Sequence, residues 1–503
     1  MVPRFTGETI DSIKLRFHRL DCRGTVQYGI FELNWMLPIN DLDPQSDTPL
    51  YRQIFDRIRV LIDSGRLEAG AKLPPTRELA GMLGLNRATV SAAYELLEAD
   101  GLISGHVGRG SFVAGRARPS GSASPDLISF ANSRPSELLF PIEEFRAACS
   151  EVIRSSDVMD ILQLGPPSGY APLRRYLLRK AREEGLAKAD DDVLITSGCQ
   201  QAFDLLQRTF ITGGETVWIE DPVYPGLKNV FHRAGARVLG MPVTPSGLDL
   251  ARLERLAAND PPSMVVVTSN FQNPTGNTLS LHERHALLAI VERTGALLIE
   301  NDVYGDLRYE GDPLPMVKQF GGGRGVVLRS FSKLAFPGLR IGWAIGPRAL
   351  LDALTATKQW SDLHSDQLSQ AVLLRFSESG RLEQHRSRVL RTGAERLRAA
   401  LDACARHLPA CSRWTQPQGG MNLWVSLPEP LDSSELLPMA EREGVTYLPG
   451  RHFAVGAPDP CSFRISFAGV TPERIETGIG MLGQVFKSGI ERAREQLQSA
   501  VIV

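Results

Sequence analysis

The stretch Val326-Val-Leu-Arg-Ser-Phe-Ser-Lys333-Leu-Ala-Phe-Pro-Gly-Leu-Arg340 carries more chemical information than any other part of this 503-residue sequence. An apolar strand pattern ends in two serines, a lysine follows at once, and an arginine comes after a Pro/Gly loop. Ser330, Ser332 and Arg340 can hold a phosphate by hydrogen bonds and charge. Lys333 can form a Schiff base with an aldehyde beside it. Pyridoxal 5′-phosphate (PLP) is such an aldehyde, although a surface lysine in a serine-rich loop would give the same short motif.

Two upstream segments place further ligands at the ends of predicted strands, where open α/β sheets bind small molecules. The strand at 193–196 ends at Ser197-Gly198, and a helix starts at once with its free N–H groups exposed, which makes this turn a candidate phosphate seat. The next strand ends at Tyr224, an aromatic that can stack on a planar ring. A core tyrosine would fit this second segment equally well.

Two more strand ends supply groups for the rest of such a ring. Asn273 precedes a proline, so its backbone is held extended and its amide can face a site. The buried pattern Leu297-Leu-Ile-Glu-Asn-Asp302-Val-Tyr304 ends in an acid and a phenol. A buried carboxylate needs a cationic or N–H partner, so we expect Asp302 to pair with a pyridinium nitrogen. Tyr304 and Asn273 would then hydrogen-bond the phenolic oxygen of the ring.

From about Leu127 to Phe486 these motifs resemble fold-type I PLP-dependent aminotransferases. The resemblance implies a mostly parallel sheet with a smaller C-terminal α+β subdomain, covalent cofactor binding at Lys333, and a substrate carboxylate held by Arg464. It also implies that one phosphate cup is formed by Gly198, Cys199, Gln200, Ser330, Ser332 and Arg340.

Two residues depart from the pattern of that family. Leu164 stands where relatives carry a tyrosine that reaches the phosphate of the partner subunit, and Cys199 stands where a hydroxyl is commoner. Each change removes one hydrogen bond from the phosphate, of order ~1 kcal/mol. We therefore expect PLP to be held less tightly than in a dedicated enzyme.

Residues 49–113 show a different pattern, of three helices and a hairpin. Apolar residues recur at helical spacing from Leu50 to Ile62. Thr76 is expected to cap a second helix, and Asn86 a third helix over 87–98. With a glycine-rich hairpin at Gly101–Val113, this order predicts a winged helix-turn-helix, in which the later helix of the motif enters the DNA major groove.

The same segment resembles the DNA-binding domain of GntR-type bacterial regulators. Between residues 49 and 116 nine Lys/Arg against seven Asp/Glu give a net charge of only +2, so DNA binding should be salt-sensitive and assisted by dimerisation. A helical accessory domain that binds protein is the alternative, but a glycine–arginine wing has little packing purpose. The candidate DNA contacts are Arg77, Asn86, Arg87, Thr89, Arg109 and Gly110.

Composition excludes several other classes. The formal net charge is −1, and six scattered cysteines lack a Cys-x-x-Cys pair, which indicates reduced thiols and no zinc site. No apolar run reaches membrane-spanning length, so we expect a cytoplasmic protein. The expected organisation is an N-terminal extension over 1–48, a DNA-binding domain over 49–113, a Gly/Ser/Pro-rich linker over 114–126, a PLP-binding domain over 127–488 and a tail over 489–503. The extension has no clear period, and we expect it to be a disordered arm or to precede a true start at Met36.

A GntR-type domain, a linker and an aminotransferase-like domain in this order resemble the MocR-type bacterial regulators. The resemblance implies PLP on Lys333 as an internal aldimine, an amine or amino acid sensed by external aldimine formation, and a head-to-tail homodimer on a double-stranded DNA operator. Any transaminase activity would be weak. Two alternatives stay open, an aminotransferase that carries a DNA-binding domain and a regulator that senses PLP itself. The sequence names neither the effector nor the operator.

Overall fold

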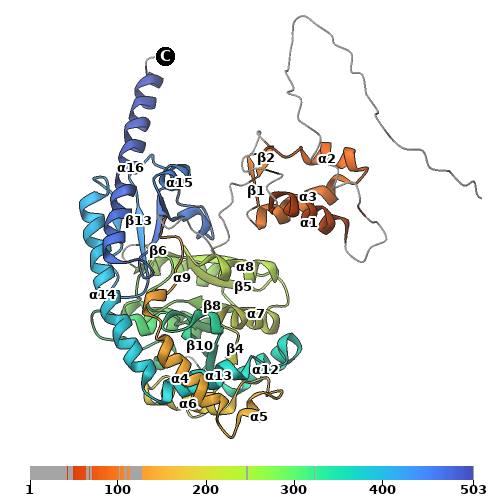
Figure 1. Ribbon diagram of the computed structural model, residues 1–503, viewed down its shortest axis with the longest axis vertical. Helices are drawn as coiled ribbons and strands as arrows, with labels where there is room; N and C mark the ends of the chain where they lie inside the picture. Colours follow the sequence, from red (N-terminus) through yellow and green to blue (C-terminus); the bar gives the residue numbers. More distant parts are fainter. Residues whose placement is uncertain are drawn as a thin grey trace, which may run out of the picture. The chain divides into compact units, whose positions relative to one another are not determined.

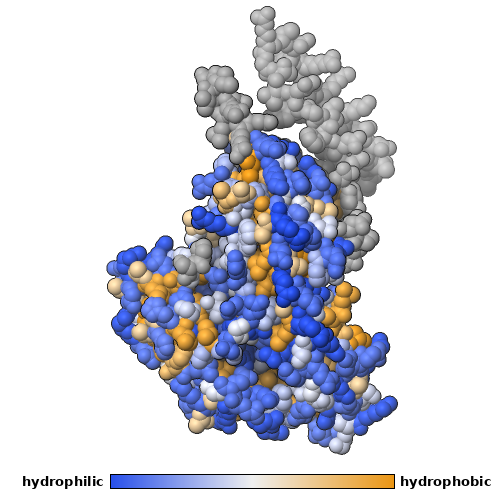
Figure 2. Space-filling model, turned by 90° about the vertical axis from the view of Figure 1, so that its left-hand side faces the viewer, coloured by the Kyte–Doolittle hydropathy of each residue, from blue (hydrophilic) through white to orange (hydrophobic). Residues whose placement is uncertain are grey.

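The computed structural model describes residues 42, 49–63, 67, 71–100, 102–106, 110–113, 127–244, 247–321 and 323–501. The chain divides into two compact units, Met1–Ala123 and Ser124–Val503. The expected linker over 114–126 and, apart from Leu42, the extension over 1–48 lie outside the described residues. Within the described part of the chain, no helix is both long and apolar enough to cross a membrane. Figure 2 shows the face on the side of α14 and α16, which is mainly hydrophilic with apolar side chains in patches.

The first unit is a winged helix-turn-helix, as the sequence predicts. Its elements are α1 (Leu50–Asp63), α2 (Thr76–Leu83), α3 (Arg87–Ala99), β1 (Ile103–His106) and β2 (Gly110–Val113) (Figure 1). The three helices bury one apolar cluster that includes Phe55, Leu79 and Val90. The Tyr94 hydroxyl donates to the Pro74 carbonyl at 2.8 Å and ties α3 to the start of α2. The hairpin pairs antiparallel, with Ile103 opposite Val113.

One helix start in this unit differs from the expectation. Thr76 is the first residue of α2 and not its N-cap, which is Pro75, and the helix start has no side-chain cap. The Pro75 carbonyl accepts from the N–H groups of Glu78 and Leu79, so the hydrogen-bonded turn begins one residue early. The expected cap at Asn86 is confirmed, because its side chain accepts from the Ala88 N–H at 3.0 Å.

The second unit is built on an eight-stranded sheet of order β4-β11-β10-β9-β8-β5-β6-β7. The central strands run parallel, whereas β11 is antiparallel to both its neighbours and β7 is antiparallel to β6. The strands are β4 (Asp191–Thr196), β5 (Thr216–Asp221), β6 (Arg237–Thr244), β7 (Gly247–Leu248), β8 (Met264–Val267), β9 (Leu297–Asn301), β10 (Gly325–Ser330) and β11 (Gly342–Pro347).

Helices cover both faces of this sheet, as continuous apolar strands require. Three helices pack on one face: α7 (Cys199–Phe210), α8 (Pro225–Arg233) and α12 (Arg348–Asp362). The other face is covered by α4 (Ile142–Ile153), α5 (Val158–Ile161), α6 (Ala171–Glu183), α9 (Leu250–Asn259), α10 (Leu281–Thr294), α11 (Val317–Phe320) and α13 (Gln367–Glu378). The expected mostly parallel α/β sheet is confirmed.

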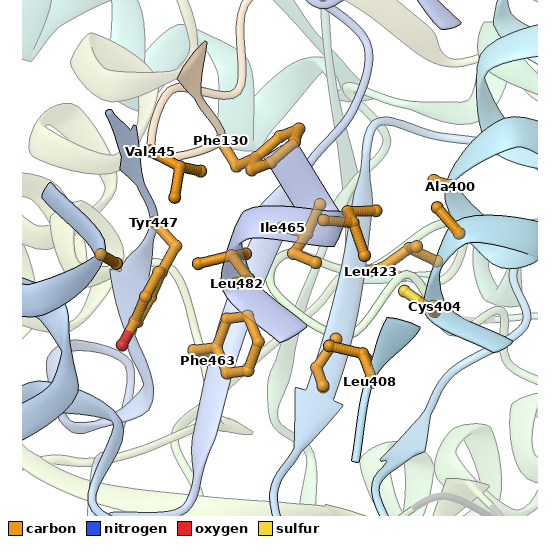
Figure 3. Packing of buried hydrophobic residues seen from close by; sticks show 14 of the residues in the cluster. Phe130, Ala400, Cys404, Leu408, Leu423, Val445, Tyr447, Phe463, Ile465 and Leu482 are labelled. Atoms are coloured by element: carbon orange, nitrogen blue, oxygen red, sulfur yellow. The ribbon is translucent and has the colours of Figure 1, made fainter. Parts of the chain in front are cut away.

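A smaller α+β subdomain follows, also as expected. Its elements are α14 (Arg381–His407), β12 (Arg413–Trp414), β13 (Asn422–Ser426), α15 (Ser433–Arg442), β14 (Val445–Thr446), β15 (Leu448–Pro449), β16 (Ser462–Ser466) and α16 (Pro472–Val501). Its core packs Phe463, Ile465 and Leu482 against Leu423 (Figure 3). Strand β3 (Ile128–Ser129), the first strand of this unit, pairs in parallel with β14, so the start of the unit joins the smaller subdomain. Helix α16 runs on across the boundary that we placed at 488/489.

Candidate functional site

A cavity of about 460 Å³ opens where the carboxyl ends of the parallel strands meet the smaller subdomain. Its lining comes from many separate segments, among them the starts of α7 and α8, the ends of β8, β9 and β10, and strand β16. Ten of the residues that the sequence suggested line it together: Cys199, Gln200, Tyr224, Asn273, Tyr304, Ser330, Ser332, Lys333, Arg340 and Arg464. Gly198 lies directly against it, and Asp302 does not line it.

One end of the cavity gathers donors suited to an anion. Gly198 has φ +77° and precedes α7, and a Cβ built on it would lie 2.4 Å from Arg340 Nη2, so only glycine lets the guanidinium approach this helix start. Arg340 Nη1 lies 3.5 Å from Ser332 Oγ. Ser330 Oγ donates to the Ile341 carbonyl at 3.0 Å and lies 2.9 Å from Ser332 Oγ. An arginine, two hydroxyls and a helix N-terminus together form an anion site.

Lys333 lies between this anion site and the smaller subdomain. Its Nζ donates to the Ser133 carbonyl at 2.8 Å and lies 5.6 Å from the centroid of the Tyr304 ring. The lysine ends the short 3₁₀ turn Phe331–Lys333 that follows β10. The amine is thus held by one neutral acceptor in an open cavity, where a carbonyl compound can reach it.

A chain of hydrogen bonds joins the phenol to the second arginine. Asn273 Nδ2 donates to Tyr304 Oη at 3.2 Å, and Arg464 Nη1 donates to Asn273 Oδ1 at 2.9 Å. Burial acts to raise the pKa of Tyr304, but the nearby Lys333 cation and the hydrogen bonds outweigh it and leave that pKa lowered. Such a chain of hydrogen bonds is expected if the Tyr304 phenol and the Asn273 amide both hydrogen-bond one oxygen of a bound ring.

Arg464 is the second candidate anion site. It is buried, its other nitrogen Nη2 donates to the Ala131 carbonyl, and its Nε has no hydrogen-bond partner among the described residues. Burial lowers the pKa of this guanidinium. Within the described part of the chain, no carboxylate lies within ion-pair distance of Arg464 or of Arg340. Each guanidinium therefore retains the capacity to bind an external anion.

One aromatic side chain, Tyr224, and one thiol, Cys199, lie on the side of the cavity formed by α7 and α8. Tyr224 is the N-cap of α8 and is 45% exposed, so it is a wall of the cavity and not the core residue that the alternative interpretation required. The Cys199 thiol donates to the Arg329 carbonyl at 3.4 Å, and burial raises its pKa to about 12. The thiol is therefore neutral and engaged with β10, so it adds little to the anion site.

The sequence led us to expect Asp302 in the lining of the cavity, but it lies outside that lining. Its Oδ1 accepts from Asn270 Nδ2 and its Oδ2 accepts from Arg329 Nε, each at 2.9 Å, and both bonds lie outside the cavity lining. Arg329 also donates to Glu184 at 2.6 Å. Burial raises the pKa of Asp302, while the Arg329 charge opposes that rise. The cationic partner that this buried carboxylate needs is Arg329 of the same chain.

Strand alternation explains why Asp302 is turned away. Successive side chains of a strand point to opposite faces of the sheet. Ile299 packs on the face covered by α7, so Asn301 belongs to that face, and Leu298, Glu300 and Asp302 belong to the opposite one. The lining accordingly includes Asn301. Counting this alternation along the strand would have identified Asn301 from the sequence.

Two other segments near the site carried no sequence signal, and only the first of them lines the cavity. Residues 131–135 enter the cavity through the Lys333–Ser133 contact, which joins residues 200 apart in the chain. Ser365 lies 3.3 Å from Ser197, between their Oγ atoms, beside the start of α7. Both segments are loops placed by tertiary packing, and no local motif marks them.

The candidate DNA contacts fall in the first unit. Arg77, Asn86 and Arg87 are exposed at the starts of α2 and α3, and Thr89 is partly exposed. Arg109 lies outside the described residues, and Gly110 opens β2 opposite His106. The exposed arginines at two helix starts suit phosphate and base contacts.

The residues of the cavity fit PLP at most of its functional groups. The anion site suits the phosphate, Lys333 the aldehyde, Tyr304 and Asn273 the phenolic oxygen, and Tyr224 a ring face. The space kept open by Gly198 beside Arg340 is part of that fit. The exception is the ring nitrogen, because none of the described residues that line the cavity is an aspartate or glutamate.

Comparison with known proteins gives two family matches. Residues 126–482 match the model of aminotransferase class I and II, and residues 50–113 match the model of bacterial regulatory proteins of the gntR family. The 2-aminoadipate transaminase of Thermus thermophilus is 35% identical over 370 residues, covering 72% of this chain and 91% of the relative.

A regulator and a solved structure extend the comparison. The probable rhizopine catabolism regulatory protein MocR of Rhizobium meliloti is 29% identical over 475 residues, covering 88% of this chain and 95% of the relative. The structure of the α-aminoadipate aminotransferase LysN from Thermus thermophilus, complexed with N-(5′-phosphopyridoxyl)-L-leucine, superposes with a TM-score of 0.68 at 34% identity. It covers 72% of this chain and 93% of that one. The match of the regulator spans both units of the chain.

Proposed function

Since this chain belongs to the aminotransferase class I and II family and joins that PLP-dependent fold to a gntR-family DNA-binding domain, as MocR-type regulators do, we propose that it is a transcriptional regulator that senses an amine or amino acid through PLP on Lys333. The regulator would act in the cytoplasm, on the nucleoid when bound to DNA.

The observation that supports this most is that one amine shares a cavity with two guanidinium groups, for which the described residues supply no carboxylate partner. Lys333 shares a cavity with Arg340 on one side and Arg464 on the other, and within the described residues neither arginine has a carboxylate partner. A phosphate and a carboxylate are the anions that such guanidinium forks bind. The phosphate of a phosphate-bearing aldehyde would bind one of these two guanidinium groups, and the carboxylate of an amino acid would bind the other.

The residues of the chain divide the work as follows. Arg340, Ser330 and Ser332 would hold the phosphate, and Tyr304 with Asn273 would orient the ring through its phenolic oxygen. Bound PLP supplies an aldehyde carbon that condenses reversibly with primary amines. The Lys333 Nζ would yield that carbon to the effector, and Arg464 would select effectors that carry a carboxylate.

Signalling to DNA requires two states of the molecule. An effector shifts their balance only if it binds one state more tightly. Release of Lys333 would break its bond to the Ser133 carbonyl, and occupation of Arg464 would change the contact of β16 with Asn273. The smaller subdomain, which carries Arg464, is therefore the part that we expect to respond. Arg87 and Asn86 would read the operator from the start of α3.

A homodimer would complete this arrangement. Several apolar residues are exposed in one copy of the chain: Leu162 at 61%, Leu164 at 78%, Leu363 at 60% and Trp360 at 90%. Gln367 donates to the Gln163 carbonyl at 2.6 Å, which joins the two segments that carry them. Apolar side chains exposed in this way mark an interaction surface. We propose that a second copy covers it in a head-to-tail dimer.

The test is a visible absorption spectrum of the purified protein, titrated with amines and amino acids and followed for hours. We expect a band of PLP bound to a lysine amine, which shifts with one ligand and then persists. The same ligand should change the affinity for operator DNA in a mobility-shift assay. If no such band forms even with added PLP, the assignment of Lys333 fails, and with it the proposal.

The aminotransferase alternative keeps one argument in its favour, the 35% identity to a transaminase. The same titration separates the two. Steady conversion to the pyridoxamine form with release of a keto acid would indicate an enzyme. A band present with PLP alone, and DNA affinity that follows PLP and no amine, would indicate a sensor of PLP itself.

A further inference from the structure

We propose that Asn301, and not Asp302, faces the ring nitrogen of bound PLP, and that its neutral amide leaves the ring without a positive charge, so that the site holds an amine effector without converting it. The inference rests on the proposed function and explains how an aminotransferase fold could serve as a sensor. It concerns one side chain at the carboxyl end of β9.

The position of Asn301 follows from the sheet. Thr268, Asn301 and Ser330 each stand two residues beyond a core residue of the α7-covered face, namely Val266, Ile299 and Leu328. All three line the cavity. The ring nitrogen of PLP lies opposite the aldehyde carbon on the ring. With the phosphate at Ser330 and the aldehyde at Lys333, the polar groups of the sheet that remain for the nitrogen are those of Asn301 and Thr268.

The amide of Asn301 is also free to take a ligand. Its Oδ1 is buried and has no hydrogen-bond partner among the described residues. Its Nδ2 makes a long contact of 3.4 Å with Thr268 Oγ1. An unsatisfied buried amide oxygen costs free energy until a partner arrives. Since the two ends of an amide can exchange by a flip of the side chain, either end can meet a ring nitrogen.

The charges around the cavity disfavour a cationic ring. Among the described lining residues four are cations, Arg134, Lys333, Arg340 and Arg464, and none is a carboxylate. Asp302, on the other face of the sheet, is already neutralised by Arg329 at 2.9 Å. A carboxylate at the ring nitrogen raises its pKa by about 1–3 units through the opposite charge, and Asn301 gives no such charge.

The chemical consequence is a weak electron sink. Conversion of a bound amino acid breaks its Cα–H bond, with the proton passing to a base such as Lys333 and the electron pair moving into the ring. A protonated ring nitrogen accepts that pair far better than a neutral one. With Asn301 at this position, the Cα–H bond of the effector stays intact and the bound state persists as a signal.

The test reads the ring nitrogen directly. The full-length protein is stripped of cofactor and reloaded with PLP labelled with ¹⁵N in the ring, and the ¹⁵N chemical shift is recorded for wild type, Asn301→Asp and Asp302→Asn. We expect a neutral-pyridine shift in wild type, the same shift in Asp302→Asn, and a pyridinium shift in Asn301→Asp. Exchange of the Cα hydrogen of a bound amino acid with D₂O should rise about tenfold or more in Asn301→Asp, in step with the gain of at least one pKa unit.

The outcomes separate this inference from the proposed function. A pyridinium shift in wild type overturns the inference and leaves the proposed function standing. If the pyridinium shift were then lost in Asp302→Asn, Asp302 would be the residue that contacts the ring nitrogen. An unchanged shift in Asn301→Asp also overturns the inference. Failure of the wild-type protein to bind PLP overturns both. The wild-type spectrum decides by itself if the buried Asp302→Asn substitution prevents folding.

Discussion

The Lys333 amine is the residue on which the proposed sensing depends. Replacing it in Lys333→Ala removes the only group proposed to bond the aldehyde, while the anion site at Arg340 stays intact. We expect loss of the visible band and of the ligand response, with basal DNA binding unchanged. The control is Lys487→Ala, an exposed lysine of α16. Loss of DNA binding in a folded Lys333→Ala protein would contradict the separation of sensing from DNA contact.

Arg464 should determine whether the effector needs a carboxylate. It is buried, and its guanidinium is held by Asn273 and Ala131 with Nε left over. In Arg464→Ala we expect the response to an amino acid to weaken roughly 10–100-fold, since a charge-assisted bond is worth about 1.5–3 kcal/mol. The response to the matching amine without a carboxylate should change little. Equal responses of wild type and variant to the amino acid would rule out this role.

Glu220 gives a pH dependence that is independent of ligand. Its Oε2 accepts from the Thr268 N–H at 3.1 Å, its Oε1 has no partner among the described residues, and burial raises its pKa from 4.5 to about 8. The folded state therefore keeps a proton that the unfolded chain releases. The contribution of this group to stability is complete below pH 4.5 and is lost as the pH rises through about 8.

We accordingly expect the stability of Glu220→Gln, relative to that of the wild type, to increase as the pH rises. The free energy of unfolding of wild type should fall relative to the variant by up to about 1.4 kcal/mol per pH unit between pH 5 and 8. Denaturant unfolding at a series of pH values measures this. The control is Glu378→Gln, at an exposed position of α13. A pH-independent difference between Glu220→Gln and wild type would mean that Glu220 does not titrate in this range.

At the scale of single elements, α3 is the one whose function can be tested directly. Arg87 is exposed at its first turn, next to the Asn86 cap. In Arg87→Ala we expect operator binding to weaken by about 1–3 kcal/mol if the side chain reads a base, with lost discrimination at one base pair. If it contacts only phosphate, binding should weaken uniformly and with a smaller salt dependence. Glu95→Gln, exposed further along α3, is the control, and an unchanged footprint in Arg87→Ala refutes the docking.

The elements themselves were largely predictable, because each depends on local sequence. The expected third helix over 87–98 is α3 over 87–99, since Asn86 supplies a cap and the apolar residues keep helical spacing. The N-cap of α2 lies one residue before the expected Thr76, because the Pro75 carbonyl accepts from the first turn and no threonine side chain does. Local sequence predicts that the helix forms, but it does not predict which of two adjacent residues is the N-cap.

The site was predictable in its parts and less so in its orientation. The residues at strand ends gather because parallel strands of one sheet end at one edge. The charge of Asp302 favours a place in the site, but the alternation of side chains along the strand turns it to the face opposite Asn301. Its actual partner, Arg329, lies 27 residues away on β10. Loop 131–135 and Ser365 had no local signal at all, since only the packing of the whole unit brings them to Lys333 and Ser197.

At the scale of the whole molecule, the exposed apolar side chains around Trp360 and Leu363 argue that one copy is incomplete. Trp360 is 90% exposed at the C-terminal end of α12, and Leu363 follows it with φ +60°, a conformation that a leucine rarely adopts. The Ser365–Ser197 contact links this segment to the start of α7, where the anion site lies. A partner that covers Trp360 would therefore also border the phosphate.

We expect Trp360→Lys to convert the proposed dimer to monomer, measured by light scattering after size exclusion. A stable interface buries about 1,200–2,000 Å², and a lysine at its centre would have to be desolvated without a partner. PLP affinity should fall as well, because this segment contacts Ser197 through Ser365 at the start of α7, where the anion site lies. The control is Val60→Lys, at an apolar position of the other unit that is 63% exposed. If Trp360→Lys stays dimeric and keeps PLP as tightly as wild type, the second copy docks elsewhere and the anion site is complete within one chain.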